Sequence, residues 1–296
     1  MLVYVTGASG FVGRKLLPRL ESAGFSTIGV DVAVDVTDRV AVESSLRRHR
    51  PDALIHLAAM SSVAQSGREP ESCYRINFLG TKNLLRAAKT VCPTARILLV
   101  GSTDQYGATK PRDHGFDENT PLEPRSPYAR TKAAAELLGQ EAAARGQDVV
   151  CVRASNHTGR GQPDRFVVSS FARQVAAIKS GRQEPRMRVG NLESVRDFLH
   201  VDDVLDAYTM LLDPGIPADV YNVASGSSVP IQEILDRLIE MADIDPVVEI
   251  DPERWRPTDW CVADASKLRT VSNWKPKISL DALLRELYDD WLSKDS

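Results

Sequence analysis

The sequence is poor in cysteine, and its cysteines form no pattern that indicates a metal site or a disulfide framework. Among 296 residues there are four, Cys73, Cys92, Cys151 and Cys261. None belongs to a Cys-x-x-Cys motif or lies at metal-ligand spacing from another. We therefore expect free thiols in a reducing compartment and no bound metal ion.

Long hydrophobic runs and a strong excess of one charge are also missing. No apolar stretch approaches the roughly 20 residues of a membrane helix, and the opening segment Met1–Gly7 lacks the charged leader of a signal peptide. The formal net charge is -3, and the absence of a long basic run argues against nucleic acid as a partner. We expect a cytoplasmic enzyme or binding protein that contacts neither membranes nor nucleic acids.

Short apolar segments alternate with helical ones along the first half of the chain, which predicts βαβ units and a parallel sheet. The expected fold class is α/β, a Rossmann-type doubly wound parallel sheet with a smaller mixed α/β C-terminal lobe. A helix predicted over Val201–Leu212 and a strand over Val220–Val223 return to the sheet. The first domain would thus comprise residues 1–155 and about 198–225. The lobe would comprise residues from about 156 to 197 and from 226 to 296.

A glycine-rich segment, Thr6–Gly13, follows the first predicted strand and precedes a helix. Gly7 permits a tight turn, Gly10 lets the backbone approach a pyrophosphate, and Gly13 lets the helix pack closely on the sheet. The helix N-terminus offers N–H groups and a partial positive charge to the phosphates. This context predicts a dinucleotide site, and the glycine spacing resembles that of the short-chain dehydrogenase/reductase superfamily.

Asp31 closes the second predicted strand. A carboxylate there accepts hydrogen bonds from the adenosine ribose and repels a 2′-phosphate, so NAD is favoured, while Arg14 and Arg39 leave NADP open. The resemblance implies adenine contacts from Asp35 and Val36 and a cofactor path beside the end of the third strand. The expected cofactor-binding residues are Gly7, Gly10, Phe11, Val12, Gly13, Asp31, Asp35, Val36, Leu57, Ala58, Ala59, Tyr128 and Lys132.

A tyrosine and a lysine, Tyr128 and Lys132, stand four residues apart on a predicted helix and therefore share a face. A phenol with a pKa of about 10 is a poor acid–base catalyst near neutrality. A nearby ammonium and an oxidised nicotinamide stabilise the phenolate, and we expect both to lower the pKa of Tyr128. Ser102, after the fourth predicted strand, completes a match to the Ser-Tyr-Lys triad of the superfamily.

Longer motifs resemble narrower groups of that superfamily. The extended branch is matched at Gly101–Gly107 and Asn77–Thr81. Over nearly the whole chain, the similarity sharpens to GDP-4-dehydro-6-deoxy-mannose reductases and the related GDP-mannose 4,6-dehydratases. The segments that carry it are Asn156–Gln162, in which Arg160 replaces the usual proline, Val189–Phe198 and the stretch from Arg256 to Asp259.

This resemblance implies where a nucleotide sugar would bind. Asn156 would contact the sugar or its phosphate, and three arginines would form the positive pocket for the diphosphate and base, since guanidinium groups suit phosphate oxygens. The expected substrate-binding residues are Ser62, Thr103, Asp104, Asn156, Phe166, Val167, Arg188, Arg196 and Arg256. Each arginine has an alternative interpretation as a surface ion-pair partner.

The expected reaction is the NAD(P)H-dependent reduction of the C4 ketone of a GDP-4-dehydro-6-deoxyhexose to a GDP-6-deoxyhexose such as GDP-rhamnose. The catalytic residues would be Ser102, Tyr128, Lys132 and Asp104. Dehydratases usually carry a glutamate where this chain has Asp104, one methylene shorter, and this difference weakens the dehydratase interpretation.

Three alternatives stay open: a GDP-mannose 4,6-dehydratase, a nucleotide-sugar 4-epimerase, and a non-catalytic dinucleotide sensor. Sensors on this fold commonly lose the tyrosine or the lysine, and both are present here. Related enzymes form homodimers through two long helices, here predicted over Tyr74–Val91 and Ser126–Arg145, which pair into a four-helix bundle. A homodimer is therefore the expected assembly.

Overall fold

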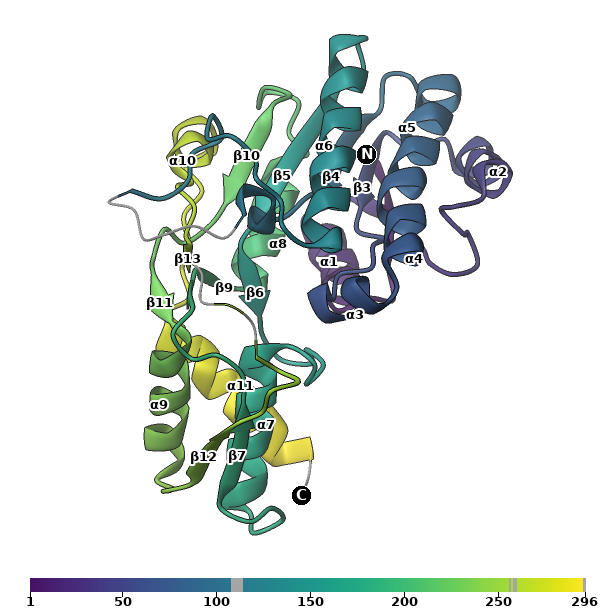
Figure 1. Ribbon diagram of the computed structural model, residues 1–296. Coiled ribbons are helices and arrows are strands. Elements are labelled where there is room, and N and C mark those ends of the chain that lie inside the picture. The colour runs from purple at the N-terminus through teal and green to yellow at the C-terminus, as the bar shows by residue number, and fades with distance from the viewer. Residues whose placement is uncertain (108–113, 256, 258–259, 295–296) are drawn as a thin grey trace.

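The computed structural model describes residues 1–107, 114–255, 257 and 260–294. Its centre is a six-stranded sheet in which every pairing is parallel (Figure 1). In spatial order the strands are β10 (Val220–Val223), β5 (Val149–Ala154), β4 (Arg96–Val100), β3 (Ala53–His56), β1 (Leu2–Thr6) and β2 (Ser26–Val30). The Rossmann-type α/β fold class is confirmed, and the strand order reverses between β1 and β3, where such folds bind ligands.

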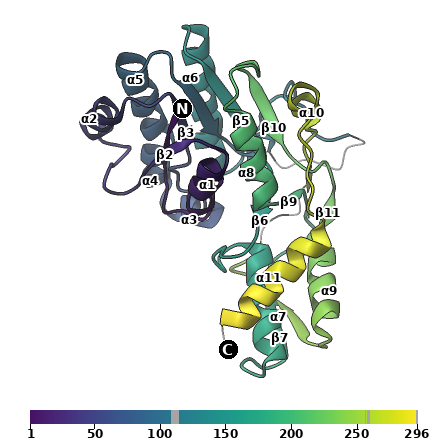
Figure 2. The same cartoon turned by 180° about the vertical axis from the view of Figure 1, so that it is seen from behind.

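Side chains on the central strands alternate between two apolar cores, as the period of a strand requires. In β1, Val3 and Val5 belong to one core, whereas Tyr4 belongs to the other. Helices α1 (Phe11–Ser22) and α8 (Val201–Met210) cover the first face, as Figure 2 shows, and α2 (Arg39–His49), α5 (Gly80–Val91) and α6 (Pro127–Ala144) cover the second.

The long helix expected over Tyr74–Val91 begins earlier and is interrupted. It consists of α4 (Pro70–Tyr74), a π-helical turn η1 (Arg75–Leu79) and α5. Within the π turn, the amide of Asn77 accepts from the Met60 N–H at 2.8 Å and donates to Thr131 Oγ1 at 3.0 Å. The wide turn therefore lies where one side chain joins the loop after β3 to α6, in keeping with the frequent placement of π turns at functional sites.

A second layer of structure lies beyond the carboxyl end of the sheet (Figures 1 and 2). Its core is formed by α7 (Val167–Lys179), α9 (Ile231–Ala242), α11 (Leu280–Lys294) and β7 (Arg186–Val189), which pairs with β12 (Val247–Ile250). Small strand groups connect it to the sheet: β6 (Asn156–Thr158) with β9 (Phe198–His200), and β8 (Val195–Arg196) between β11 (Val229–Pro230) and β13 (Trp260–Cys261).

The apolar residues that pack against the sheet, and those that pack within the lobe, show how the chain divides into domains. Residues of α8 and β10 pack with the sheet, as do Trp260, Leu268 of α10 (Ser266–Ser272) and Trp274. We therefore propose that the stretch 260–274 belongs to the sheet domain and not to the lobe expected at residues 226–296. Within the described part of the chain, every helix is too short or too polar to cross a lipid bilayer.

Candidate active site at the carboxyl end of the sheet

The glycine loop between β1 and α1 is packed so tightly that side chains are excluded. Gly7 has a positive φ of 70°, and a Cβ there would lie 2.7 Å from the Ala58 backbone nitrogen. A Cβ on Gly13 would lie 2.4 Å from the carbonyl oxygen of Gly7. The loop therefore presents bare backbone at the start of α1, which is the cradle that a pyrophosphate requires. Gly10, Phe11 and Val12 form the edge of this cradle and the first turn of the helix.

The end of β3 lies directly beside this loop. The N–H of Leu57 donates to the Thr6 carbonyl at 3.2 Å, and the N–H of Ala58 donates to Thr6 Oγ1 at 3.2 Å. Leu57, Ala58 and Ala59 are all half-buried. The structure thus brings together two segments that the sequence assigns to the cofactor.

Asp31 follows β2, and its carboxylate accepts from the Ser9 N–H of the glycine loop at 2.7 Å. Asp35 accepts from the Thr37 N–H at 2.8 Å, and this turn places Val36 against α5, where a Cβ on Gly80 would meet the Val36 side chain at 2.8 Å. Of the three residues expected around the adenosine, Asp31 contacts the glycine loop directly, and Asp35 and Val36 follow it in the segment after β2.

The phenol of Tyr128 lies in the first turn of α6, which begins with a Ser126 side chain capping the Ala129 N–H at 3.0 Å. Ser102, at the end of β4, hydrogen-bonds to the Tyr128 hydroxyl. Burial and the nearby Asp104 carboxylate raise the pKa of Tyr128, and the Ser102 hydrogen bond opposes them only in part. This direction is opposite to the expected one, because burial in apolar surroundings disfavours the phenolate.

Lys132 is buried one turn along the same helix, and its ammonium donates to the Val100 carbonyl at 2.7 Å. Burial lowers its pKa to about 8. The neighbouring His56, at the end of β3, has its pKa lowered to about 3 by burial and by Lys132. A cavity of about 10 Å³, enough for about one water molecule, is lined by residues that include Lys132 and Glu136.

The short 3₁₀ helix η2 (Thr103–Tyr106) carries the other candidates on this loop. The Asp104 N–H donates to Ser102 Oγ at 3.2 Å, and the Asp104 carboxylate lies close enough to Tyr128 to raise the pKa of the phenol. Thr103 is only 2% exposed, and its carbonyl accepts from the Cys261 thiol at 3.5 Å. Asp104 is therefore near the phenol, whereas Thr103 is buried.

The expected substrate residues lie on several elements. Asn156 on β6 donates to the Asp197 carbonyl at 3.4 Å, which places it next to Arg196 on β8. Phe166 and Val167 begin α7. Ser62 caps α3 (Val63–Arg68), and Ser66 of that helix accepts from the Tyr128 N–H at 3.2 Å.

The two expected arginines that the structure describes lie on different elements. Arg188 is exposed on β7, where its backbone N–H and carbonyl bond to the side chain of Gln174, at 2.8 and 3.2 Å. Arg196 belongs to a different small sheet, nearer the central one. Arg256 lies outside the described residues.

Sequence reasoning missed several residues that surround the site. Arg254 donates to Ser170 Oγ at 3.0 Å and adds a guanidinium beside α7. Gln105, Glu136 and Arg153 form a buried polar network behind Ser102 and Lys132. The one available signal was spacing, since Glu136 follows Lys132 by four residues on the same helix.

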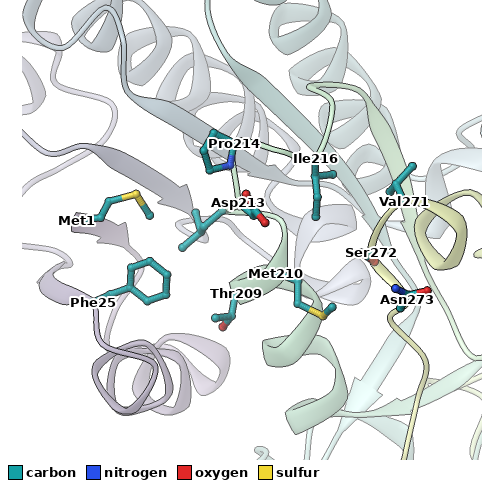
Figure 3. Close-up of a pocket in the computed structure, with 11 residues that line it drawn as sticks. Met1, Phe25, Thr209, Met210, Asp213, Pro214, Ile216, Val271, Ser272 and Asn273 are labelled. Carbon is teal, nitrogen blue, oxygen red and sulfur yellow. The ribbon is translucent and has the colours of Figure 1, made fainter.

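A separate groove lies away from these residues. It has a volume of about 530 Å³, and Figure 3 shows Met1 and Phe25 on one side of it and Met210 and Asn273 on the other. Met1 and Phe25 precede β1 and β2, so this groove lies at the amino end of the strands, opposite to Tyr128 and Ser102.

Comparison with known proteins agrees with this geometry. The family model described as GDP-mannose 4,6 dehydratase matches residues 31–287. The GDP-6-deoxy-D-mannose reductase of Pseudomonas aeruginosa is 37% identical, over 99% of this chain and 97% of its own. The GDP-6-deoxy-D-talose 4-dehydrogenase of Aggregatibacter actinomycetemcomitans is 29% identical, over 99% and 98%.

Solved structures superpose over almost the entire chain. The structure of RMD from Pseudomonas aeruginosa complexed with NADPH has a TM-score of 0.91 at 36% identity and covers 99% of both chains. The UDP-glucose 4-epimerase of Thermus thermophilus in complex with NAD has a TM-score of 0.88 at 28% identity, with 98% and 99% covered. The resemblance to the extended short-chain dehydrogenase/reductases is thereby confirmed.

Proposed function

Because this chain belongs to the GDP-mannose 4,6-dehydratase family, we propose that it is an NAD(P)H-dependent reductase acting on the C4 ketone of a GDP-4-dehydro-6-deoxyhexose. The product would be a GDP-6-deoxyhexose of the rhamnose type. One observation carries the proposal: a buried phenol, Tyr128, that keeps its proton and is hydrogen-bonded to Ser102 at the carboxyl end of the sheet.

The residues of the glycine loop fit a dinucleotide. Gly7 and Gly13 pack directly against neighbouring backbone, so neither position could carry a side chain without a clash. The first N–H groups of α1, which have no partner within the helix, would bind the phosphate oxygens. Asp31 would bind the adenosine ribose, which favours NADH over NADPH. When bound, the reduced nicotinamide supplies the hydride for the ketone carbon.

Tyr128 would act as the proton donor. Ser102 orients the phenol and donates to the substrate oxygen, and Tyr128 transfers its proton to that oxygen as negative charge develops there. A raised pKa suits this role, because the phenol stays protonated at neutral pH and an alkoxide is a stronger base than a phenolate. Lys132 places a positive charge at the end of β4, one turn along α6 from Tyr128, and would bind the nicotinamide ribose.

Asp104 supports a reductase over a dehydratase. Its carboxylate lies close enough to Tyr128 to raise the pKa of the phenol, but it is one methylene shorter than a glutamate. We assign it to binding a substrate hydroxyl. Asn156 and Arg196 would contact the sugar and the diphosphate, with Phe166, Val167, Arg188 and Ser62 around them.

The test is turnover by the purified protein. GDP-4-dehydro-6-deoxy-mannose should be converted to a GDP-6-deoxyhexose with stoichiometric loss of NADH or NADPH. GDP-mannose consumed without added dinucleotide would instead identify a dehydratase, and interconversion of UDP-sugars an epimerase. Failure to reduce the 4-ketone with either dinucleotide would overturn the proposal.

We propose a homodimer through α5 and α6, supported by Leu137, which is 61% exposed on α6, and by Tyr74, which is 48% exposed beside these helices. The four cysteines are all buried and free, which supports a cytoplasmic location.

A further inference from the structure

We propose that Gln105 and Glu136 are positioning residues for the proton-transfer pair Ser102 and Tyr128. Glu136 lies on α6 four residues after Lys132 and eight after Tyr128, so the three side chains follow one face of the helix. It is 4% exposed. The inference rests on the proposed function, since it concerns the same site.

The carboxylate of Glu136 accepts four hydrogen bonds from three side chains. Arg153 on β5 forms a two-pronged pair with it, at 2.9 Å from Nε and 2.6 Å from Nη2. Gln105 Nε2 donates to it at 2.7 Å, and Gln140 Nε2 at 3.0 Å. Arg153 also donates to the Tyr106 hydroxyl at 2.8 Å, so the charge pair is fixed to both β5 and η2.

Gln105 links the Glu136 carboxylate to Ser102. Its Oε1 accepts from the Ser102 N–H at 2.8 Å, while its Nε2 donates to Glu136, so both ends of the amide are engaged. The amide also fills the space beside Gly101, where a Cβ would lie 2.4 Å from Gln105 Oε1. Ser102 cannot shift without breaking this hydrogen bond.

The contacts close into a ring. Tyr128 bonds to Ser102, Ser102 to Gln105, and Gln105 to Glu136, which returns to the helix that carries Tyr128. The position of Ser102 relative to the phenol is therefore set before substrate arrives. Such preorganisation matters because a misplacement of about 1 Å costs on the order of 10²-fold in rate.

Gln105→Met tests this link while leaving the Arg153–Glu136 pair intact. We expect kcat to fall on the order of 10- to 100-fold, with the dinucleotide Kd and the KM for the sugar nucleotide nearly unchanged. Gln140→Met is the matched control: it removes a donor from the same carboxylate but has no contact with Ser102. It should keep the wild-type kcat.

Gln105→Glu gives a readout that a loss of folding cannot mimic. Ionised, the new carboxylate would repel Glu136; protonated, its O–H would donate to Glu136 and its carbonyl would accept from Ser102, as the amide does. Relative to the wild type, kcat of this variant should rise as the pH falls, whereas the ratio for Gln105→Met should stay flat.

The outcomes separate the two proposals. Wild-type protein that does not reduce the 4-ketone refutes the proposed function. Active wild type with an unimpaired Gln105→Met variant refutes the positioning role alone, as does a Gln105→Glu variant whose relative kcat is independent of pH. An equal loss of dinucleotide binding in Gln105→Met would show a general structural defect and would also overturn the inference.

Discussion

The carboxylate of Asp31 accepts a hydrogen bond from the backbone N–H of Ser9 at 2.7 Å, and this contact joins the end of β2 to the glycine loop. It fixes a negative charge where the adenosine ribose of a dinucleotide would bind. An additional phosphate on that ribose would meet this charge at short range.

Asp31→Asn should therefore shift the dinucleotide preference toward NADPH. Removal of the charge is expected to raise the ratio of kcat/KM for NADPH to that for NADH by roughly tenfold, which corresponds to about 1.4 kcal/mol. Steady-state kinetics with both dinucleotides measures it. Glu43→Gln, which removes a partly exposed acid on α2, should leave the ratio as it is; an unchanged ratio in Asp31→Asn would argue against this role.

The glycine loop gives a prediction about packing. A Cβ at Gly13 would come within 2.4 Å of the Gly7 carbonyl. Gly13→Ala should therefore lower the free energy of unfolding by about 1–3 kcal/mol through overpacking and weaken dinucleotide binding. Calorimetric titration and thermal unfolding provide the two measurements.

Gly67 is the control for that experiment, because a Cβ at this helical position has no atom within 4 Å. Gly67→Ala should bind dinucleotide as the wild type does and unfold at the same temperature or a slightly higher one. If Gly13→Ala behaves like Gly67→Ala, the loop is not the close-packed cradle described above.

His56 predicts a pH dependence of stability. Its pKa is about 3 in the folded protein against an ordinary value of 6.5, because the ring is buried. Between pH 6.5 and about 3, His56 is protonated in the unfolded chain but stays neutral in the folded chain. Stability contributed by His56 is thus full above that pH and is lost as the pH falls toward 3, by an amount on the order of several kcal/mol.

Thermal unfolding measured across this acidic range checks the prediction. His56→Gln removes the titrating group, so its melting temperature should fall less steeply with decreasing pH than that of the wild type. His114→Gln removes an exposed histidine and should retain the wild-type slope. Identical slopes for all three proteins would contradict the assignment.

The proposed dimer predicts a surface effect at Leu137, which is exposed on α6. Leu137→Glu should shift the protein toward the monomer in sedimentation velocity, since a buried carboxylate without a partner is costly. Val40→Glu, at an equally exposed apolar residue on α2, should leave the sedimentation coefficient unchanged. A monomeric wild type would remove the dimer proposal.

Much of the sheet domain follows from local sequence. The runs of apolar residues at Leu2–Thr6 and Arg96–Val100 are long enough to indicate buried strands, and Gly7 and Tyr128 belong to motifs whose spacing is local. The strands β6, β8 and β13 are only two or three residues long, too short to show a periodicity. They form only because the folded chain brings them beside their partner strands between the sheet domain and the lobe.

Properties that depend on tertiary contacts were not predictable. Spacing places Lys132 beside Tyr128, but the direction of the pKa shift of Tyr128 depends on burial and on Asp104. The partner of Glu136 is likewise hidden, because Arg153 lies on a different element and is joined to it only in the folded chain.

The central claim is that Tyr128 delivers the proton to the reduced ketone, and Tyr128→Phe tests it most directly. Hydride transfer from NADH or NADPH to GDP-4-dehydro-6-deoxy-mannose should slow by a factor on the order of 10²–10⁴, the usual contribution of a general acid, with dinucleotide affinity unchanged. A Tyr128→Phe protein that reduces this substrate at the wild-type rate would contradict the account.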